Sequence, residues 1–371
     1  MKFQLDRSAL LNCLQVVHGV VERRERLPIL SNILVALGDE TISMTATDME
    51  IELVARTSAP GGVAGEVTVP ARKLVDICRT LPEDAAVEFS AVESRANVRA
   101  GRSRFTLNTL PSSDFPTTDA IEGVVEVSVR QRDLKELFER TQFAMANQDV
   151  RYYLNGLLLE FRGNRLRAVS TDGHRLAQAE VELQGSSDGE EVHQCILPRK
   201  GVHELMRLIQ NSDDTAKVVV GKASLQMAFG DVTFTSRLIE GRFPDYNRVI
   251  PRPEQCDKEA DVDRELARRS LQRASILSNE KYRTVRLSFT DGSLHVAANN
   301  PDHEEAEDEV DIQYTGDSVE IGFNVGYLID ALGVLPTETV TFHLSDPGSS
   351  CLLTPKDDDG SCRYVVMPMR L

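Results

Sequence analysis

The chain has 371 residues with 58 acidic and 42 basic side chains, and its formal net charge of −16 should repel nucleic acid unless the cations gather on one surface. Its six cysteines include no C-x-x-C pair, which argues against a disulfide framework and favours buried, reduced thiols. Asp6 and Arg7 interrupt the apolar run that a signal peptide needs, and no segment reaches the ~18 apolar residues of a membrane helix, so we expect a soluble, cytoplasmic protein.

The first third of the chain contains a segment, residues 67–82, in which a strand leads into a helix. After Pro70, its apolar residues recur at the spacing of one helix face: Leu74, Val75, Cys78 and Leu81. Thr47-Asp48 forms a tight turn upstream of this segment, and a strand beginning at Phe105 closes the unit downstream. We therefore expect strands and helices to be mixed within this part of the chain.

The middle third begins with an amphipathic helix, whose apolar face comprises Leu134, Leu137, Phe138 and Thr141. Two strands follow at residues 157–161 and 166–170, and Gly163-Asn164 supplies the turn between them. A second strand-to-helix segment covers residues 195–209. These elements have the same order as those of the first third.

The last third repeats this order, because residues 321–336 again lead from a strand into a helix. Pro70 and Pro198 are 128 positions apart, and Pro198 and the corresponding Asn324 are 126 positions apart. The apolar stripe of this helix has the same phase as that of the first copy and comprises Leu328, Ile329, Leu332 and Leu335. The chain therefore contains three copies of one unit.

Each copy should be a whole domain with its own core, since solenoid and propeller repeats have only ~20–50 residues. Two helices packed on antiparallel sheet make an α+β domain. Three tandem copies of roughly 100–150 residues each account for the length of the chain. Turn formers interrupt the pattern near residues 121–123 and 251–254. We place the domains at residues 1–122, 123–253 and 254–371.

Basic residues gather on the predicted helices, whereas acidic residues gather elsewhere. Six basic residues lie between Arg264 and Arg283 against two glutamates, while residues 302–311 hold seven carboxylates. The second helices of the first two copies carry Arg72, Lys73 and Arg79, and Arg199, Lys200 and Arg207. Cations on one helix usually form a solvated face, but the same bias in equivalent helices favours a shared basic surface.

Signatures of enzymes are absent from the sequence, which has no G-x-G-x-x-G after a strand, no P-loop, no H-E-x-x-H and no G-x-S-x-G. Asp172 and His174 could form an acid–base pair, yet the equivalent turns at Thr47-Asp48 and Asn299-Asn300 have no histidine. Asp, Gly and Asn are residues that a tight turn requires, so a structural role is favoured. The seven histidines show no metal-ligand spacing. We assign no catalytic residue, no metal and no cofactor.

Two further segments allow two interpretations each. Arg151-Tyr152-Tyr153 could place buried tyrosines in a strand, or could present an exposed cation and two rings to phosphate, sugar or a stacked base. Residues 365–371 are apolar up to the last residue, whereas most termini are polar. This tail is either a final sheet strand or the wall of an apolar surface for several partners, or both.

Several motifs together resemble one family across the whole chain, from Met1 to Leu371. They are Val150-Arg-Tyr-Tyr-Leu-Asn-Gly, Thr171-Asp-Gly-His-Arg-Leu, Pro198-Arg-Lys-Gly-Val, Gly241-Arg-Phe-Pro-Asp-Tyr, Ile276-Leu-Ser-Asn-Glu-Lys and Val366-Met-Pro-Met-Arg-Leu. On these motifs the chain is similar to the beta sliding clamps, the beta subunits of bacterial DNA polymerase III.

The resemblance implies a head-to-tail homodimer, in which six like domains close a ring with helices around the hole and sheets outside. Basic helices would then face double-stranded DNA without reading its sequence. Retention on DNA would come from topology, so the ring would be a processivity factor without catalysis. Its partners would be the polymerase III catalytic subunit, the clamp loader, other polymerases and repair proteins, which bind through short linear motifs.

The resemblance also implies three sets of functional residues. DNA contacts would come from Arg24, Arg72, Arg102, Gln148, Tyr152, Tyr153, Arg199 and Lys200. The partner-peptide cleft would comprise Leu154, Thr171, Gly173, His174, Arg175, Leu176, Pro244, Arg248, Val249, Ser350, Val365, Met367, Pro368, Met369 and Arg370. At the dimer interface, Phe105 and Leu107 would meet Ile276 and Leu277 of the other chain, with Lys73 facing Glu304 and Glu305.

The sequence departs from the family's pattern in three places. Residues 355–360 look like a lengthened acidic hairpin near the cleft, residues 23–26 are unusually charged, and the second helix of the third copy lacks the Arg-Lys pair. Other function classes also stay open at this point. They are a repeat-built scaffold that does not bind DNA, including a trefoil-like monomer, and a hydrolase centred on Asp172 and His174.

Overall fold

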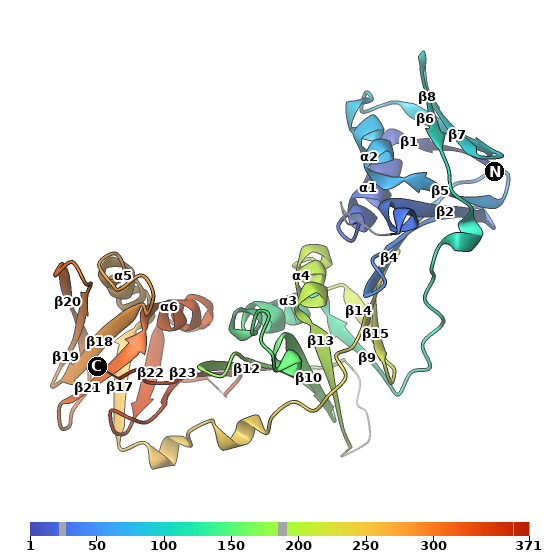
Figure 1. Cartoon of the computed structure of the whole chain (residues 1–371). Coiled ribbons are helices and arrows are strands. Elements are labelled where there is room, and N and C mark those ends of the chain that lie inside the picture. Colours follow the sequence, from blue (N-terminus) through green and yellow to red (C-terminus); the bar gives the residue numbers. More distant parts are fainter. Residues whose placement is uncertain (22–26, 185–190, 359, 371) are drawn as a thin grey trace. The chain divides into compact units, whose positions relative to one another are not determined.

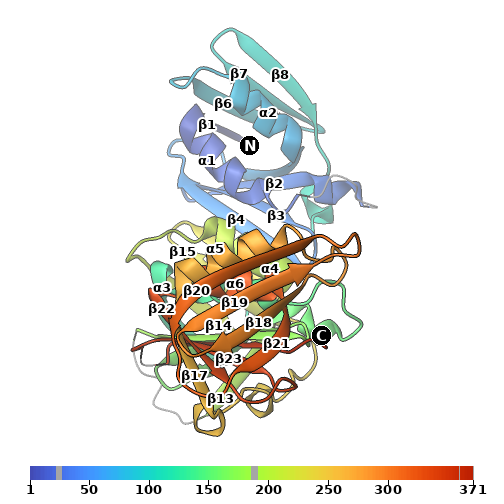
Figure 2. The same cartoon turned by 90° about the vertical axis from the view of Figure 1, so that its left-hand side faces the viewer.

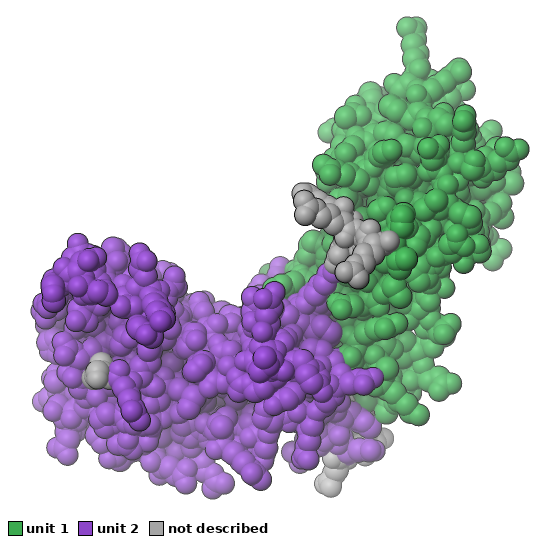
Figure 3. Space-filling model, in the orientation of Figure 1, with its two compact units in different colours: residues 1–132, 203–238 green, residues 133–202, 239–371 purple. Residues whose placement is uncertain are grey.

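The computed structural model describes residues 1–21, 27–184, 191–358 and 360–370 (Figure 1). One order of elements occurs three times along the chain: a strand, a helix, four strands, a second helix and three strands. This order confirms the predicted fold class of three tandem α+β copies. The described residues form two compact units: unit 1, residues 1–132 and 203–238, and unit 2, residues 133–202 and 239–371 (Figure 3).

The first copy lies wholly in unit 1. Its elements are β1 (Lys2–Asp6), α1 (Arg7–His18), β2 (Asn32–Gly38), β3 (Thr41–Thr47), β4 (Ile51–Ser58), β5 (Gly65–Pro70), α2 (Ala71–Thr80), β6 (Ala86–Val92), β7 (Arg95–Ala100) and β8 (Ser103–Asn108). Helix α1 packs against α2, β3 and β4 (Figure 2). The apolar stripe predicted on α2 is buried, as are Leu10 and Leu14 of α1. Arg7 donates through Nε to the carbonyl of Cys78 at 2.9 Å, which satisfies an open carbonyl at the end of α2.

The middle copy contributes to both units. Its elements are β9 (Val125–Arg130), α3 (Gln131–Glu139), β10 (Gly156–Arg162), β11 (Arg165–Thr171), β12 (Arg175–Glu182), β13 (Val192–Pro198), α4 (Arg199–Leu208), β14 (Thr215–Val220), β15 (Ser224–Phe229) and β16 (Val232–Arg237). The predicted apolar face of its first helix is fully buried, and Gly163 has a positive φ of 55° in the predicted turn. Strands β10 to β13 belong to unit 2 and the other four to unit 1. The domain boundaries at residues 122 and 253 stay predictions.

The third copy lies in unit 2. Its elements are β17 (Lys258–Asp263), α5 (Arg264–Ser275), β18 (Thr284–Thr290), β19 (Ser293–Asn299), β20 (Glu305–Gln313), β21 (Val319–Asn324), α6 (Val325–Val334), β22 (Thr339–Leu344), β23 (Cys351–Pro355) and β24 (Cys362–Val366). Helices α5 and α6 pack side by side (Figure 1). Arg264 donates to the carbonyls of Thr337 and Leu332, both at 3.0 Å, so it repeats in this copy the role of Arg7.

Strand pairing joins successive copies edge to edge. In unit 1 the sheet order is β5-β2-β3-β4-β16-β15-β14-β9, so the fourth strand of the first copy pairs with the last strand of the second. In unit 2, β12 pairs with β24 in the same way. Among the described residues this leaves two such edges open: β8, which ends the sheet β1-β6-β7-β8, and the first part of β20, since β17 pairs only with Gln313 and Ile312.

The six cysteines are all free thiols, and only Cys256 is not buried. Burial raises the pKa of Cys78 to about 11 and that of Cys195 to about 12, so these thiols stay protonated and unreactive at neutral pH. The prediction of reduced, buried cysteines is confirmed for five of the six. None of the helices in the described part of the chain has the length and apolar character needed to cross a bilayer.

Candidate functional site

The segment that holds Asp172 and His174 is a tight turn between β11 and β12. The Asp172 carboxylate accepts the backbone N–H groups of His174 at 2.9 Å and Arg175 at 3.1 Å, and Gly173 has a φ of +90°. The equivalent Asp48 of the first copy accepts two backbone N–H groups in the same way, at 2.9 and 2.7 Å. Asp172 therefore fixes the turn. The geometry does not favour the hydrolase interpretation.

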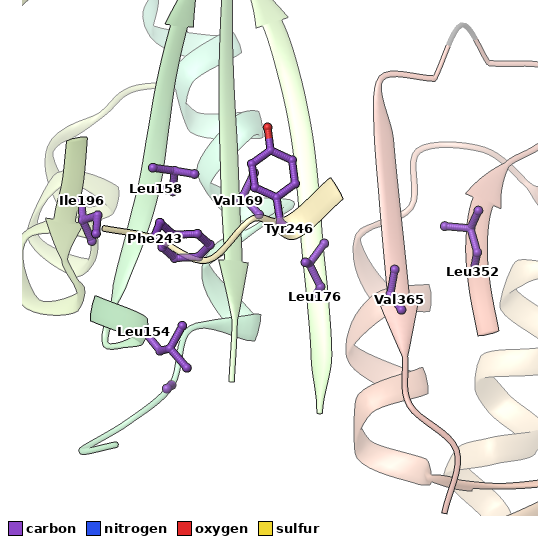
Figure 4. Close-up of a cluster of buried hydrophobic side chains, with 10 residues drawn as sticks. Leu154, Leu158, Val169, Leu176, Ile196, Phe243, Tyr246, Leu352 and Val365 are labelled. Carbon is purple, nitrogen blue, oxygen red and sulfur yellow. The ribbon is translucent and has the colours of Figure 1, made fainter. Parts of the chain in front are cut away.

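Ten buried side chains of unit 2 form one apolar cluster beside this turn (Figure 4). They are Ala146, Leu154, Leu158, Val169, Leu176, Ile196, Phe243, Tyr246, Leu352 and Val365. The cluster combines β10 to β13 of the middle copy, the segment that follows it, and β23 and β24 of the third copy. Three predicted cleft residues, Leu154, Leu176 and Val365, belong to it, so the structure brings together residues that are more than 200 positions apart.

The other predicted cleft residues lie around this cluster with more exposure. Gly173, His174, Pro244, Arg248, Val249, Met367 and Arg370 are exposed, and Thr171, Arg175, Ser350, Pro368 and Met369 are partly buried. Val249 and Met367 are 56% and 47% exposed, unusually high for large apolar side chains. The set therefore combines a buried apolar floor with exposed apolar side chains, a composition that suits an extended apolar peptide.

The C-terminal tail is a strand and continues beyond it. Strand β24 pairs with both β12 and β23. Past its end, the backbone N–H of Met367 donates to the carbonyl of His174 at 2.9 Å, and that of Met369 to Gly322 at 2.7 Å. The expectation of a final sheet strand is confirmed only for Val365 and Val366, where β24 ends. These two hydrogen bonds hold the exposed Met367 beside the turn that carries the other cleft residues.

Arg175 is a predicted cleft residue whose guanidinium is used inside the chain. It contacts Asp172 at 3.0 Å, Asp330 at 2.6 Å and the carbonyl of Phe143 at 2.6 Å, and it lies 4.5 Å from the ring centre of Tyr327. Asp330 and Tyr327 belong to α6 of the third copy. Arg175 therefore fixes β12 to the next copy, and its side chain has few donors left for a partner peptide.

A partly buried polar network next to the cluster was not predicted from the sequence. The Tyr246 hydroxyl accepts from Arg167 Nη1 at 3.1 Å and donates to Glu160 at 3.2 Å. Gln194 donates to the same carboxylate at 2.7 Å. Burial raises the pKa of Tyr246, so its hydroxyl keeps its proton and remains a donor. The network holds the segment after Phe243 on β10 and β11. A glutamate inside the apolar strand 157–161 was the only sequence signal for it.

Candidate DNA residues occur in both units. In unit 1, Arg72 and Arg102 are exposed. In unit 2, Gln148 and Lys200 are exposed, and Tyr152 is 56% exposed. Arg24 lies outside the described residues. All these assignments stay predictions.

The tyrosine segment is not a strand, so that interpretation was wrong. Residues 152–154 form a short 3₁₀ helix, η4 (Tyr152–Leu154), whose backbone turns Tyr152 outward, Leu154 inward and leaves Tyr153 partly buried. The ring of Tyr153 packs against the apolar cluster.

Arg72 and Arg199 both lie in the first turn of a second helix but have different environments. Arg72 is exposed and lies 3.8 Å from Asp76, one helical turn away. Arg199 is partly buried, and its Nη1 donates to the carbonyls of Met145 at 2.8 Å and Ala146 at 3.3 Å. Most of the cations predicted on α5 are likewise paired: Arg268 and Arg269 with Glu265, and Arg273 with Asp308. The excess of positive charge predicted for this helix is therefore smaller than its residue count suggests.

Three of the predicted interface residues, Phe105, Leu107 and Glu305, lie on the open strands β8 and β20. Phe105 and Leu107 belong to β8, where Leu107 is buried and Phe105 is partly buried. Ile276 is 76% exposed just after α5, and Leu277 beside it is partly buried. Lys73, Glu304 and Glu305 are exposed. Their contacts across an interface stay predictions.

The predicted acidic hairpin joins β23 to β24. Its one cation, Lys356, contacts Asp261 of β17 at 2.6 Å, and Asp358 contacts the hydroxyl of Ser361. Asp359 lies outside the described residues. The hairpin is therefore fixed to the sheet of the third copy at its start.

Comparisons with known proteins agree on one family. Models of the DNA polymerase III beta subunit match the chain in succession: the N-terminal domain at residues 1–119, the central domain at residues 128–245 and the C-terminal domain at residues 247–370. The chain is 51% identical to the beta sliding clamp of Pseudomonas aeruginosa and 47% identical to that of Escherichia coli K12, with 100% of each chain covered.

Solved structures give the same result. The DNA polymerase III subunit beta of Pseudomonas aeruginosa matches with a TM-score of 0.96 at 50% identity, and the beta sliding clamp of Caulobacter crescentus with 0.94 at 37%, each over 100% of both chains. A Pseudomonas aeruginosa sliding clamp bound to griselimycin matches with a TM-score of 0.95 at 51% identity. The chain belongs to the family of DNA polymerase III beta subunits, the beta sliding clamps.

Proposed function

We propose that this chain is a DNA sliding clamp, in which two copies close head to tail into a ring around duplex DNA and carry replication and repair proteins along it. The family supports this function, and the open sheet edges are the observation that carries the ring. Two junctions inside the chain, β4 with β16 and β12 with β24, use one type of pairing. The leftover strands β20 and β8 are the equivalents of β4 and β16. Pairing them between two chains makes two more such junctions and satisfies both open edges.

The internal junctions predict the register at the junction between chains. Phe234 lies opposite Leu53 at the first junction, and Tyr364 lies opposite Ala177 at the second. Phe105 is the third residue of β8 after its hairpin turn, and Phe234 is the third residue of β16 after the equivalent turn, so the two correspond. Phe105 therefore takes the position of a large aromatic residue facing a smaller aliphatic one.

The opposite strand is aligned in the same way. Ala177 is in the second residue pair after the turn between β11 and β12, and Ala306 is in the second pair after the turn between β19 and β20. The two alanines are therefore equivalent. Phe105 should therefore face Ala306 of the partner subunit. The neighbouring exposed residue, Arg104, should face Glu307 of the partner subunit, which gives an ion pair at the junction.

The first test of this ring is its mass in solution. We expect native mass spectrometry and light scattering to give twice the mass of one chain, because a head-to-tail dimer satisfies both open edges. A monomer would contradict the ring and would favour a repeat scaffold, since a single chain cannot close around DNA.

Binding to DNA would depend on enclosure and on exposed cations such as Arg72, Arg102 and Lys200, with phosphate as the ligand. Such contacts carry no sequence information, so the ring can move along the duplex. The protein would have no catalytic activity, and it would act in the cytoplasm. Its partners would be the polymerase III catalytic subunit, the clamp loader, other polymerases and repair proteins.

Partner proteins would bind the predicted cleft residues through a short extended peptide with a glutamine and apolar side chains. The apolar cluster of unit 2 supports this site, and so does the related clamp solved with griselimycin, a peptide-like ligand. Main-chain groups at the tail are already paired with His174 and Gly322, so apolar contact should dominate the affinity.

Removal of Met369 to Leu371 should weaken peptide binding at least about tenfold, because it removes the hydrogen bond to Gly322 that holds Met367 in place. Met367→Ala should weaken it in the same direction. The matched control is Met49→Ala, since Met49 is 45% exposed against 47% for Met367 and lies far from the cleft residues in sequence, in the turn between β3 and β4 of unit 1. Fluorescence anisotropy of a labelled peptide measures all three. Undiminished affinity in the truncated protein, with the dimer intact, would show that the site lies elsewhere.

A further inference from the structure

One short segment of unit 2, residues 148–155, contributes to both proposed binding surfaces. Gln148, Tyr152 and Tyr153 are candidate DNA contacts, while Leu154 is 2% exposed within the apolar cluster under the cleft. Tyr152 and Leu154 belong to the same single turn of 3₁₀ helix. A shift of that turn therefore moves groups on both surfaces at once.

Arg151 connects this segment to the turn that carries the cleft residues. Its Nε and Nη2 contact the two carboxylate oxygens of Asp149 at 3.0 and 2.9 Å, and its Nη2 also donates to the backbone carbonyl of Asp172 at 3.3 Å. The guanidinium lies directly against Gly173, where an added Cβ would be 2.9 Å from Nη2. Arg151 therefore contacts the 171–175 turn at the point where its backbone takes a positive φ.

The guanidinium is held in this position by its own segment. The Asp149 carboxylate also accepts the backbone N–H of Arg151 at 2.8 Å, and Asn155 closes the loop with two hydrogen bonds of 2.9 Å to the backbone of Asp149. Hydrogen bonds from Arg151 lower the pKa of Asp149 to about 2, so this carboxylate is charged at neutral pH. A planar guanidinium with two bonds to one carboxylate has a fixed direction, which a lysine could not reproduce.

The opposite side of the segment touches the other part of the cleft. Gly241 has a φ of +140°, and a Cβ added there would be 3.4 Å from the Tyr152 hydroxyl, so the tyrosine ring lies over this glycine. Gly241 precedes Phe243 and Pro244, which belong to the apolar cluster and to the predicted cleft. The segment is thus in contact with two of the three chain segments that bear exposed cleft residues, the third being the C-terminal tail.

We propose that Arg151 is a positioning residue that couples DNA contact to peptide binding, by joining the DNA-facing segment 148–153 to the 171–175 turn. This inference rests on the proposed function. A ligand that orders one of two connected segments also restricts the other. The second ligand then loses less conformational entropy on binding, so each ligand favours the binding of the other. By linkage, DNA raises peptide affinity by the same factor by which peptide raises DNA affinity.

The test measures peptide affinity with and without DNA. A fluorescent peptide with one glutamine and three leucines is titrated with the full-length protein, alone and with a saturating short linear duplex at low salt. We expect the duplex to lower the peptide Kd about fivefold in the unchanged protein. In Arg151→Lys the ratio of the two Kd values should fall to about one, although the charge available to phosphate is kept.

Two glycine variants separate positioning from charge. Gly173→Ala places a methyl group against the Arg151 guanidinium and should also remove the coupling. Gly163→Ala is its control, because Gly163 also has a positive φ but has no atom within 4 Å of an added Cβ. Arg165→Lys is the control for Arg151→Lys, since Arg165 is an exposed arginine of the same unit that is paired with Glu180.

The outcomes separate this inference from the proposed function. If the unchanged protein binds peptide and DNA with a Kd ratio of one, or if Arg151→Lys keeps the full ratio, the coupling role is wrong and the clamp function stands. If the unchanged protein binds neither probe, the proposed function fails and the inference fails with it. Loss of coupling in Arg151→Lys and Gly173→Ala, with retention in both controls, supports it.

Discussion

Once closed around a circular duplex, the protein should stay bound at about 1 M salt and should leave when the DNA is cut once. At that ionic strength the Debye length is only about 3 Å, so contacts between exposed arginines and phosphates no longer hold the complex. A protein held by six to ten phosphate contacts alone loses about 10³–10⁵ in affinity between 50 and 200 mM salt. Enclosure depends much less on salt, because release requires the opening of a whole sheet junction.

The measurement is gel filtration of labelled protein that a clamp loader has placed on a nicked plasmid. Half of the sample is treated with an enzyme that cuts the plasmid once before the column is run in high salt. Protein should elute with the uncut circle and be absent from the linear DNA. Equal release from both forms would show that the protein binds along the duplex surface and does not encircle it.

The local elements of this fold could be predicted from the sequence because their causes are local. The stripe at Leu74, Val75 and Cys78 predicts α2, since residues at helical spacing share one face whatever surrounds them. The turn at Asp172 could likewise be predicted, because an aspartate that accepts the N–H groups two and three residues ahead needs no distant partner.

The exposure and the hydrogen-bond partners of individual side chains could not be predicted in the same way. Arg72 and Arg199 both lie in the first turn of a second helix, yet one is exposed and the other donates to the carbonyls of Met145 and Ala146. The sequence does not show which carbonyls remain open nearby, because that depends on where distant backbone segments end. Counting cations on α5 overestimated its free charge for the same reason, since the acceptor of Arg273 is Asp308 of β20.

The pairing of β12 with β24 could be predicted only in part from the sequence. Strand β24 could be predicted from the apolar tail, but its neighbour could not, because a short, mostly buried strand fits several sheet edges. Repetition supplies the missing information, since a junction seen at two places in the structure predicts a third. The two internal junctions therefore predict the register in which β8 of one chain pairs with β20 of another.

That register predicts the effect of a charge reversal at the junction between chains. Arg104→Glu should place two like charges opposite each other, the introduced carboxylate against Glu307 of the partner subunit, and should shift the protein towards monomer. A cross-strand pair contributes up to about 1 kcal/mol, and a head-to-tail dimer has two identical junctions. The dimer Kd should therefore rise by up to about 30-fold, a change of about 2 kcal/mol. Glu307→Arg should have the same effect.

The double variant, Arg104→Glu with Glu307→Arg, should restore the dimer, because each junction again has one charge of each sign. The control is Arg99→Glu, since Arg99 is an exposed arginine on β7 whose carboxylate neighbour, Glu88, is in its own chain at 4.0 Å. Sedimentation velocity over a range of protein concentrations measures all four proteins. Rescue by the second charge cannot come from a general loss of stability, which a further reversal would only increase. If the single variants dissociate and the double variant stays monomeric, β8 and β20 meet in a different register, and the equivalence between the internal junctions and the junction between chains is wrong.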